Sequence, residues 1–369
     1  MAEPITHVGI DAHQRQLQIA LLIGGAREPL EWTCPTDTAA IERLRRRLER
    51  EAPGAIECCY EAGPTGYGLQ RRLTRGRIRC QVVAPSMIPR KPGERIKTNR
   101  RDARKLAELL RGALLTEVHP PSIDDEAVRD LCRAHDDARG DLLRARQRLS
   151  KLLLRRSLVY PHGKAWTKRH FEWLNTLRWP HPAEQHVVSD YRIAIQHLEA
   201  RLVELSQALE QLAGQAPYAP AAAALRCFRG IDTLTAMSLL AELHDFRRFP
   251  HPRALMAYVG LVPSEDSTGD RRRRGAITKT GNNLVRRLLV QAAWHYYHQP
   301  RQSVGLKQRR LGQPQTVIAI ADKAEQRLCR RYARLCARHK PKPLAITAVA
   351  RELIGFVWAV LQLPEARMH

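Results

Sequence analysis

The first part of the chain alternates short apolar runs with amphipathic, basic stretches. An apolar run at 7–10 ends at Asp11, and an alternating stretch then leads to Gly24-Gly25, which is the pattern of a β-hairpin. An amphipathic helical pattern over 37–51 follows, and after it come two more runs of strand length, IECCYEAG and RCQVVAP. A basic loop then leads into a helix in PGERIKTNRRDARKLAELLR. This order predicts an α/β domain over 1–120, with a mixed sheet and helices on its faces.

From about Asp124 onward the periodicity is helical. Six apolar residues recur at steps of three and four, as in a heptad seam: Ile195, Leu198, Leu202, Leu205, Leu209 and Leu212. A basic helix over about 124–157 is the expected partner, so 121–216 is predicted to form long antiparallel coiled-coil helices. PYAPAAAA is interpreted as a linker, and a mostly α-helical domain is predicted over 217–369.

The segment 160–182, between the two long helices, contains three of the six tryptophans among several basic residues. One interpretation is an insert that stacks on bases and binds phosphates. The other is a small hydrophobic cap over the helix ends. The sequence leaves both open.

The charge of the chain indicates a polyanionic partner. Lys and Arg number 62 against 37 Asp and Glu, a formal net charge of +25. Such a field raises the local concentration of any polyanion, so nucleic acid is the first candidate and an anionic membrane surface the second. We find no apolar stretch of about 18 residues and no signal-peptide pattern, and therefore expect no membrane span and a cytosolic protein. The eight cysteines form no C-x-x-C pair, which argues against a zinc site.

Three carboxylates stand where predicted strands or loops end: Asp11, Glu61 and Asp102. Mg²⁺ takes oxygen ligands, and carboxylates from separate strand ends can converge on it. Two metal ions can clamp the attacking and leaving oxygens of a phosphoryl transfer. The alternative is that these acids are caps or surface charges. Asn99-x-x-Asp102 in particular fits a helix N-cap followed by an acid in the first turn.

The block VPSEDSTGDRRRRGAITKTGNN carries a second kind of chemistry. Ser267-Thr268-Gly269 has the composition of a turn, and cations that could stabilise charge at phosphorus follow it: Arg271, Arg272, Arg273, Arg274 and Lys279. A serine attacking a phosphodiester needs such help, because its hydroxyl is a weak nucleophile. The alternative is a solvated charged loop. Upstream, FRGIDTLTAMSLLAEL has the shape of half a helix-hairpin-helix, where helix-start N–H groups meet a phosphate.

Taken together, four segments resemble the DEDD-type insertion-sequence transposases that are guided by a bridge RNA: VGIDAH, YEAGPTGYGLQRRL, PGERIKTNRRDARKLAELLR and AYVGLVPSEDSTGDRRRRGAITKTGNNLVRRLLVQAAW. The resemblance spans nearly the whole chain. It implies a RuvC-like, RNase H-type domain, a coiled coil and a C-terminal transposase domain with a catalytic serine. It also implies a dimer or tetramer acting on target and donor duplex DNA with a structured bridge RNA. The expected location is the bacterial cytoplasm at the nucleoid, with no membrane partner.

The resemblance assigns the site residues by position. Asp11 and Glu61 match the first two acids that bind Mg²⁺, and Asp102 matches the fourth. The third acid is replaced by Asn99, which implies a weaker or single-metal site, or an amide that serves mainly as a helix cap. Ser267 is the expected nucleophile and Thr268 the alternative. Nucleic-acid contacts are expected from the basic residues named above and from Lys97, Arg100, Arg101 and Asn282.

Two further hypotheses compete with an RNA-guided recombinase. A metal-dependent, structure-selective nuclease would use Asp11, Glu61 and Asp102 to activate water, without a covalent intermediate. A non-enzymatic, basic nucleic-acid-binding protein would use neither the acids nor the serine. Only the recombinase traps protein on a DNA strand, so denaturing gels separate it from the other two.

Overall fold

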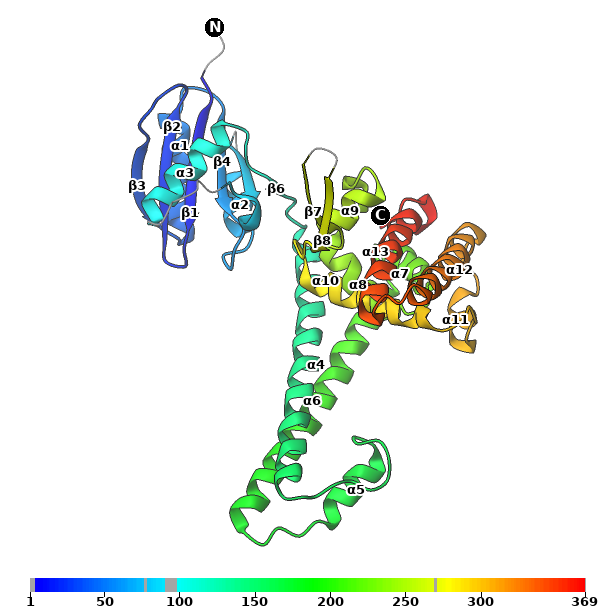
Figure 1. The fold of residues 1–369 in the computed structure, drawn as a ribbon. Coiled ribbons are helices and arrows are strands. Elements are labelled where there is room, and N and C mark those ends of the chain that lie inside the picture. Colours follow the sequence, from blue (N-terminus) through cyan, green and yellow to red (C-terminus); the bar gives the residue numbers. More distant parts are fainter. Residues whose placement is uncertain (1–3, 76–77, 90–97, 269–270, 369) are drawn as a thin grey trace. The chain divides into compact units, whose positions relative to one another are not determined.

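The computed structural model describes residues 4–75, 78–89, 98–268 and 271–368 (Figure 1). The chain divides into two compact units, Met1–Pro121 and Ser122–His369. The stretches predicted as a coiled-coil region and as a C-terminal domain both lie in the second unit. Lys97, a predicted nucleic-acid contact, lies outside the described residues.

The first unit is built on a six-stranded mixed sheet with the order β3-β2-β1-β4-β5-β6. β1, β4 and β5 are parallel, whereas β2, β3 and β6 pair antiparallel with their neighbours. The predicted mixed sheet is confirmed, with the expected hairpin as β1 and β2 and the two later apolar runs as β4 and β5. The strands are β1 (Thr6–Ala12), β2 (Gln16–Ile23), β3 (Leu30–Pro35), β4 (Ile56–Glu61), β5 (Ile78–Val83) and β6 (Glu117–Val118).

Helices cover both faces of this sheet. α1 (Thr38–Glu51) and α2 (Gly68–Leu73) pack on the face that contains Ile10 and Tyr60. α3 (Asn99–Arg111) packs on the other face, where Ala103 and Ala107 are buried with residues of β2. A short 3₁₀ turn, η1 (Pro85–Met87), follows β5. The helix predicted over 37–51 is therefore confirmed as α1.

The cap of α3 is Thr98 and not the predicted Asn99. Thr98 has extended backbone angles, and its hydroxyl oxygen accepts a hydrogen bond from the N–H of Arg101 at 3.3 Å. Asn99 is already the first helical residue, so its side chain cannot fill the capping position. Asp102 does lie in the first turn, where a carboxylate is favoured by the helix dipole.

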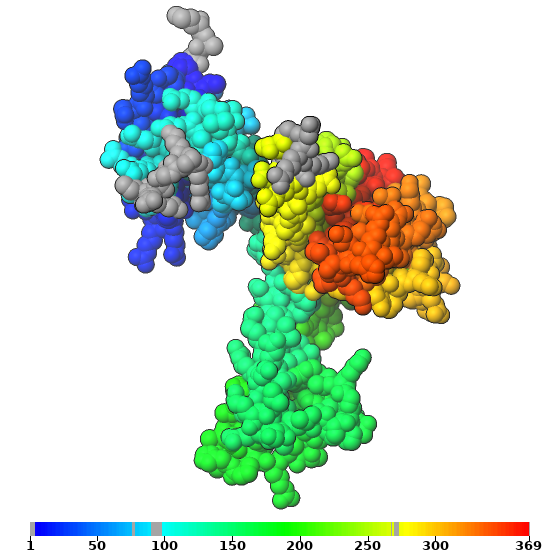
Figure 2. Space-filling view, in the orientation of Figure 1, coloured from blue at the N-terminus to red at the C-terminus, as the bar shows by residue number. Residues whose placement is uncertain are grey.

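In the second unit, two long helices, α4 (Ile123–Arg155) and α6 (Pro182–Ala213), pack antiparallel along each other (Figure 1). Hydrogen bonds join His135 to Ser206 at 3.2 Å and Arg146 to Glu199 at 2.6 Å, so the start of α4 meets the end of α6. Along the predicted heptad seam, Ile195 and Leu209 are buried and the four other leucines are half-buried. Figure 2 shows this pair projecting from the helical body of the same unit.

The Trp-rich segment, including α5 (Lys168–Thr176), folds over the far ends of α4 and α6. Trp166, Trp173 and Trp179 are half-buried against a cluster that includes Leu149 and Ile195. None of the three rings stands free in solvent. Of the two interpretations of this segment, the packing favours the hydrophobic cap.

The body of the second unit consists of helices and one β-hairpin, with α13 through its core (Figure 1). The remaining elements are α7 (Ala219–Arg226), α8 (Thr233–Leu243), η2 (Phe246–Arg248), α9 (Pro252–Tyr258), β7 (Pro263–Thr268), β8 (Arg271–Ile277), α10 (Asn283–Ala293), η3 (Trp294–Tyr297), α11 (Val304–Arg310), α12 (Gln315–Ala337), α13 (Lys342–Leu361) and η4 (Pro364–Ala366).

One sequence-based expectation about this body is wrong. PYAPAAAA is no linker: its alanines form α7, and Ala221, Ala222 and Ala224 are buried because small side chains allow close helix packing. The helix α13 is the most apolar of the long described helices, with one 18-residue window of mean hydropathy 1.8, although Arg351 and Glu352 interrupt its apolar run. Nine of its residues are buried in the protein core, which accounts for its composition.

A buried carboxylate joins three distant parts of the second unit. Glu242 on α8 is only 5% exposed. It accepts hydrogen bonds from Arg133 of α4 at 2.7 and 3.0 Å and from the Asn282 amide at 2.6 Å. Pairing of this kind offsets the cost of burying the charge.

Candidate functional site

Asp11 and Glu61 lie side by side at one edge of the sheet. β1 and β4 are parallel, and their register pairs Ile10 with Tyr60, so the next residue on each strand is an acid. Parallel strands are about 4.8 Å apart, which brings the two carboxylates close together. Both residues line one cavity of about 890 Å³.

The first turn of α3 lies on the same face of the sheet as these two acids. A Cβ on Gly9 would approach the Ala103 carbonyl oxygen to 2.0 Å, so only glycine lets α3 come this close to β1. Because side chains alternate along a strand, Asp11 points to the same face as Gly9. Likewise, the Cys59 thiol donates to the Leu106 carbonyl of α3, which places Glu61 on this face.

Asn99 and Asp102 precede Ala103 and Leu106 by one helical turn, so they continue the sheet-facing stripe of α3. The C-terminal end of α3 lies at the opposite edge of the sheet, where Arg111 donates to the Ala26 carbonyl. The start of α3 therefore points toward the edge that carries Asp11 and Glu61, although neither Asn99 nor Asp102 lines the cavity that these two acids share.

These four side chains are hard oxygen donors, which suits Mg²⁺. Within the described ranges, no three His, Cys, Asp or Glu side chains are close enough together to form a metal-binding group. The oxygen donors fit magnesium in kind, but the four side chains would have to move closer together to coordinate one ion.

Ion pairs to the edge strand β3 hold α3 in place. Glu31, whose side chain is 7% exposed, accepts hydrogen bonds from Arg100 and Arg104. Arg104 also pairs with Glu28 at 2.9 Å. Arg100, predicted to contact nucleic acid, thus pairs with Glu31 while its side chain stays 70% exposed, and the neighbouring Arg101 is exposed as well.

Two residues near the acids were not singled out from the sequence. Nε2 of His13 lies 3.0 Å from the Asp11 carboxylate, and His13 lines the same cavity. The Tyr60 hydroxyl donates to the Gly66 carbonyl at 2.9 Å and holds the loop after Glu61. Burial raises the pKa of Tyr60, so it remains a neutral donor. The Asp-x-His spacing was the available signal for His13.

The serine block forms a β-hairpin rather than a turn within a helical region. Ser267 and Thr268 end β7, where Ser267 pairs with Arg272 and Thr268 with Arg271. The side chains of Ser267, Arg271 and Arg272 are outside the described part of the structure. Arg273, Arg274 and Lys279 are exposed, and Arg274 lies 3.5 Å from the Glu265 carboxylate.

The base of this hairpin is tightly built. Gly281 has φ +69°, and a Cβ there would approach the Tyr258 carbonyl oxygen to 1.9 Å. Arg286 donates to the carbonyls of Val259 and Gly281 at 3.1 and 3.2 Å. Asn282, predicted to contact nucleic acid, caps α10 through the Val285 N–H and donates to Glu242. Its side chain therefore links the start of α10, which follows the hairpin, to Glu242 of α8.

Gly281→Ala is expected to destabilise the second unit by about 2–5 kcal/mol, because it adds backbone strain and a steric clash. Urea unfolding followed by circular dichroism measures the change. Gly305→Ala is the matched control, since nothing lies within 4 Å of its added Cβ. Equal unfolding midpoints for the two variants would contradict this account of the hairpin base.

Comparisons with known proteins agree with this layout. The model for a transposase family with a DEDD domain matches 8–157, and the model described as "Transposase IS116/IS110/IS902 family" matches 222–304. The transposase-family protein y4qE of Sinorhizobium fredii is 40% identical over 98% of this chain and 89% of its own length. The chain belongs to the IS110/IS116 family of insertion-sequence transposases.

Two other relatives extend the comparison of this transposase. The transposase for insertion sequence element IS1533 of Leptospira borgpetersenii is 36% identical over 90% of this chain and 97% of its own length. The transposase for element IS1328 of Yersinia enterocolitica is 28% identical over 66% of this chain and 70% of its own. Family membership implies DNA cleavage and rejoining in general, and DEDD domains of this kind generally use divalent metals. The first matched range contains Asp11, Glu61 and Asp102, and the second contains β7 and β8.

Proposed function

We propose that this transposase is a bridge-RNA-guided DNA recombinase that cuts and rejoins target and donor DNA through a covalent 5′-phosphoserine intermediate. Its first unit would then be a RuvC-like nuclease domain, with α4 and α6 as the coiled coil. The partners are a structured bridge RNA, two DNA duplexes and further copies of the chain, as a dimer or tetramer. The protein would act in the bacterial cytoplasm at the nucleoid.

The observation that supports this most is the register of β1 and β4. It sets Asp11 beside Glu61, and α3, whose first turn carries Asp102 and Asn99, packs on the same face of the sheet. A common metal site requires such a shared edge and face, which supports this assignment over separate caps or surface charges. Asp11, Glu61 and Asp102 would hold Mg²⁺, and Asn99 could add a neutral carbonyl oxygen.

The magnesium supplies Lewis-acid stabilisation of charge on the phosphoryl oxygens. The Ser267 hydroxyl attacks phosphorus, so that an O–P bond forms while the bond from phosphorus to the 3′ oxygen breaks. The serine proton goes to a base, and the 3′ oxygen leaves as a hydroxyl after taking up a proton. Attack by the 3′ hydroxyl of another strand reverses these bond changes and frees the serine. Arg273, Arg274 and Lys279 supply positive charge near the hairpin.

The nucleic acid that copurifies with the full-length protein tests this proposal. We expect a discrete structured RNA from the non-coding end of the element. With that RNA, Mg²⁺ and both DNA duplexes, a denaturing gel should show protein bound to a DNA strand. Cleaved DNA without such an adduct would favour a nuclease that uses water. Intact DNA would favour a protein that only binds nucleic acid.

His13 is expected to position Asp11 for Mg²⁺. His13→Ala should lower the cleavage rate about 10–100-fold and raise the Mg²⁺ concentration needed for half-maximal rate, because a partner that orients a ligand is lost. His13→Gln keeps a donor group and should restore part of both quantities. An unchanged Mg²⁺ midpoint in His13→Ala would show that the contact has no such role.

A further inference from the structure

A second cavity lies in the helical body of the second unit, away from β7 and β8 in the sequence. It has a volume of about 310 Å³ and is bordered by the turn between α7 and α8, by η3 and by the start of α11. Its lining includes three arginines, a histidine and a serine against one carboxylate: Arg229, Arg301, Arg309, His295, Ser303 and Asp232. This turn is the FRGID segment of the sequence. The chemistry proposed for the acids and for the β7–β8 hairpin does not use it.

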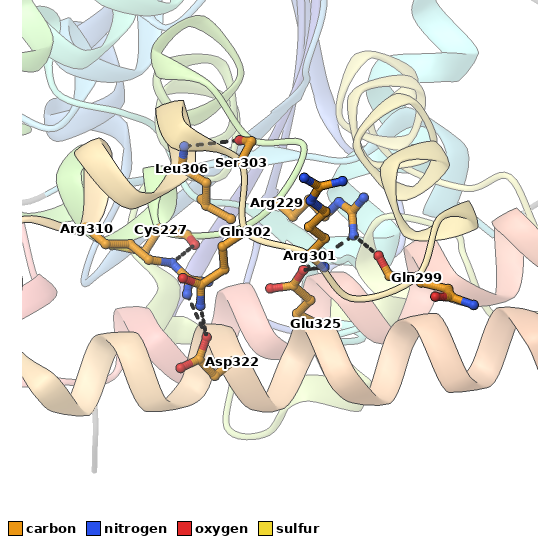
Figure 3. Close-up of polar contacts among 10 residues, drawn as sticks. All are labelled: Cys227, Arg229, Gln299, Arg301, Gln302, Ser303, Leu306, Arg310, Asp322 and Glu325. Carbon is orange, nitrogen blue, oxygen red and sulfur yellow. Dashed lines mark hydrogen bonds and ion pairs between the residues drawn. The ribbon is translucent and has the colours of Figure 1, made fainter.

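A buried acid beneath the cavity holds part of this lining. Glu325 on α12 is 4% exposed. It accepts hydrogen bonds from Nη1 of Arg229 at 3.3 Å and from the backbone N–H of Arg301 at 3.0 Å (Figure 3). Arg309 is fixed separately, because it donates to the Ile231 carbonyl. Two arginines are thus oriented before any ligand arrives, while the Arg301 side chain has no polar partner among the described residues.

The positive charges are not balanced inside the cavity. Burial, and next the charge of Arg226, lowers the pKa of Arg309. Burial, and next the charge of Arg229, lowers the pKa of His295. The Asp232 carboxylate opposes both of these pKa shifts, and it also caps α8, accepting from the Thr235 N–H at 2.8 Å. An anion in the cavity would relieve this repulsion.

We propose that this cavity binds a backbone phosphate of a nucleic-acid strand, either DNA or RNA, that the protein holds during recombination. The proposal rests on the proposed function. Arg301 can donate to the phosphate oxygens with its fork of N–H groups, and Arg229 and Arg309, which also line the cavity, add positive charge. The Ser303 hydroxyl accepts from the Leu306 N–H at 3.2 Å, as Figure 3 shows, and keeps its own proton to donate. Contacts of this kind position a strand without reading its sequence.

Arg301→Ala tests the cavity, because it removes the guanidinium and leaves the backbone bond to Glu325 in place. Lys307→Ala is the matched control: it removes one positive charge from α11, the helix that follows Arg301, at an exposed residue that does not line the cavity. Binding of the full-length protein is measured by fluorescence anisotropy over a series of salt concentrations, with Ca²⁺ replacing Mg²⁺. The probes are a duplex with the terminal sequence of the element and the structured RNA from its non-coding end.

Arg301→Ala should weaken binding about tenfold for one of the two probes, the value for one lost charge-assisted hydrogen bond. The slope of log K against log salt should fall by about 0.9 if the strand is duplex DNA, or about 0.7 if it is single-stranded. Arg301→Glu should weaken binding of the same probe further, and Lys307→Ala should leave it nearly unchanged. The probe that responds identifies the strand.

Unchanged affinity and slope for both probes would overturn the proposal, as would an equal loss in Lys307→Ala. The adduct on denaturing gels is a separate readout. If the wild-type protein forms the adduct and Arg301→Ala has the same salt slope as wild type, only the cavity assignment fails. If the slope falls and no adduct forms with Mg²⁺, the recombination chemistry fails and the phosphate site stands.

Discussion

Ser267→Ala is expected to abolish the covalent protein–DNA adduct and to lower strand exchange by more than about 1000-fold, because no other group replaces the lost nucleophile. Ser267 is the penultimate residue of β7 and pairs with Arg272, which the exposed Arg273 and Arg274 follow on β8. Purified protein is incubated with RNA, labelled DNA and Mg²⁺, and the adduct is counted on a denaturing gel.

Ser264→Ala is the control for this change, since Ser264 is an exposed serine on the same strand. It should retain the adduct. Thr268→Ala should also retain it if Ser267 is the nucleophile. An adduct that persists in Ser267→Ala and disappears in Thr268→Ala would transfer the role to Thr268. Persistence in both single variants would contradict a hydroxyl nucleophile at either position.

Glu61→Gln should stop strand cleavage while nucleic-acid binding is kept. A magnesium ligand supports several kcal/mol of charge stabilisation, and 1.36 kcal/mol corresponds to tenfold in rate, so the loss should be at least about 100-fold. Cleavage of labelled DNA under single-turnover conditions gives the rate, and anisotropy gives the affinity.

Glu57→Gln is the matched control, because Glu57 lies on the same strand and pairs only loosely with Arg79, at 3.6 Å. It should cleave at nearly the wild-type rate. If Glu61→Gln and Glu57→Gln lose the same amount of activity, the sheet edge is not the metal site. Loss of binding together with cleavage in Glu61→Gln would indicate a folding defect, which circular dichroism would reveal.

The sheet could be predicted in outline because its central strands are apolar and separated by amphipathic segments. Periodicity could not reveal that Asp11 and Glu61 share one register, since pairing between β1 and β4 is set by contacts across 50 residues of chain. β3 was missed because its residues are only partly buried at the sheet edge and do not alternate clearly. The register is what turns two separate acids into one candidate site.

The β7–β8 hairpin was not predicted, and the reason is physical. Its sequences, PSEDST and RRRRGAI, have almost no apolar alternation, so the usual signal of a half-buried strand is absent. Opposite charges lie across the two strands instead, as in Glu265 with Arg274 and Asp266 with Arg273. The requirement for glycine at 281, at the base of the hairpin, could be recognised only from the atoms that surround it in the structure.

The junction at Glu242 affects how the second unit can fold during synthesis. Arg133 precedes its carboxylate partner by 109 residues, and Asn282 follows it by 40. Contacts this distant in sequence raise the contact order and slow folding. As the chain leaves the ribosome, Arg133 of α4 can pair with Glu242 only after α8 has been synthesised. The remaining hydrogen bond to Glu242 forms only after Asn282, at the start of α10, has emerged. A nascent chain that ends before Asn282 would lack both the amide donor to Glu242 and α10, and it would leave apolar surface of α8 exposed for chaperones to engage.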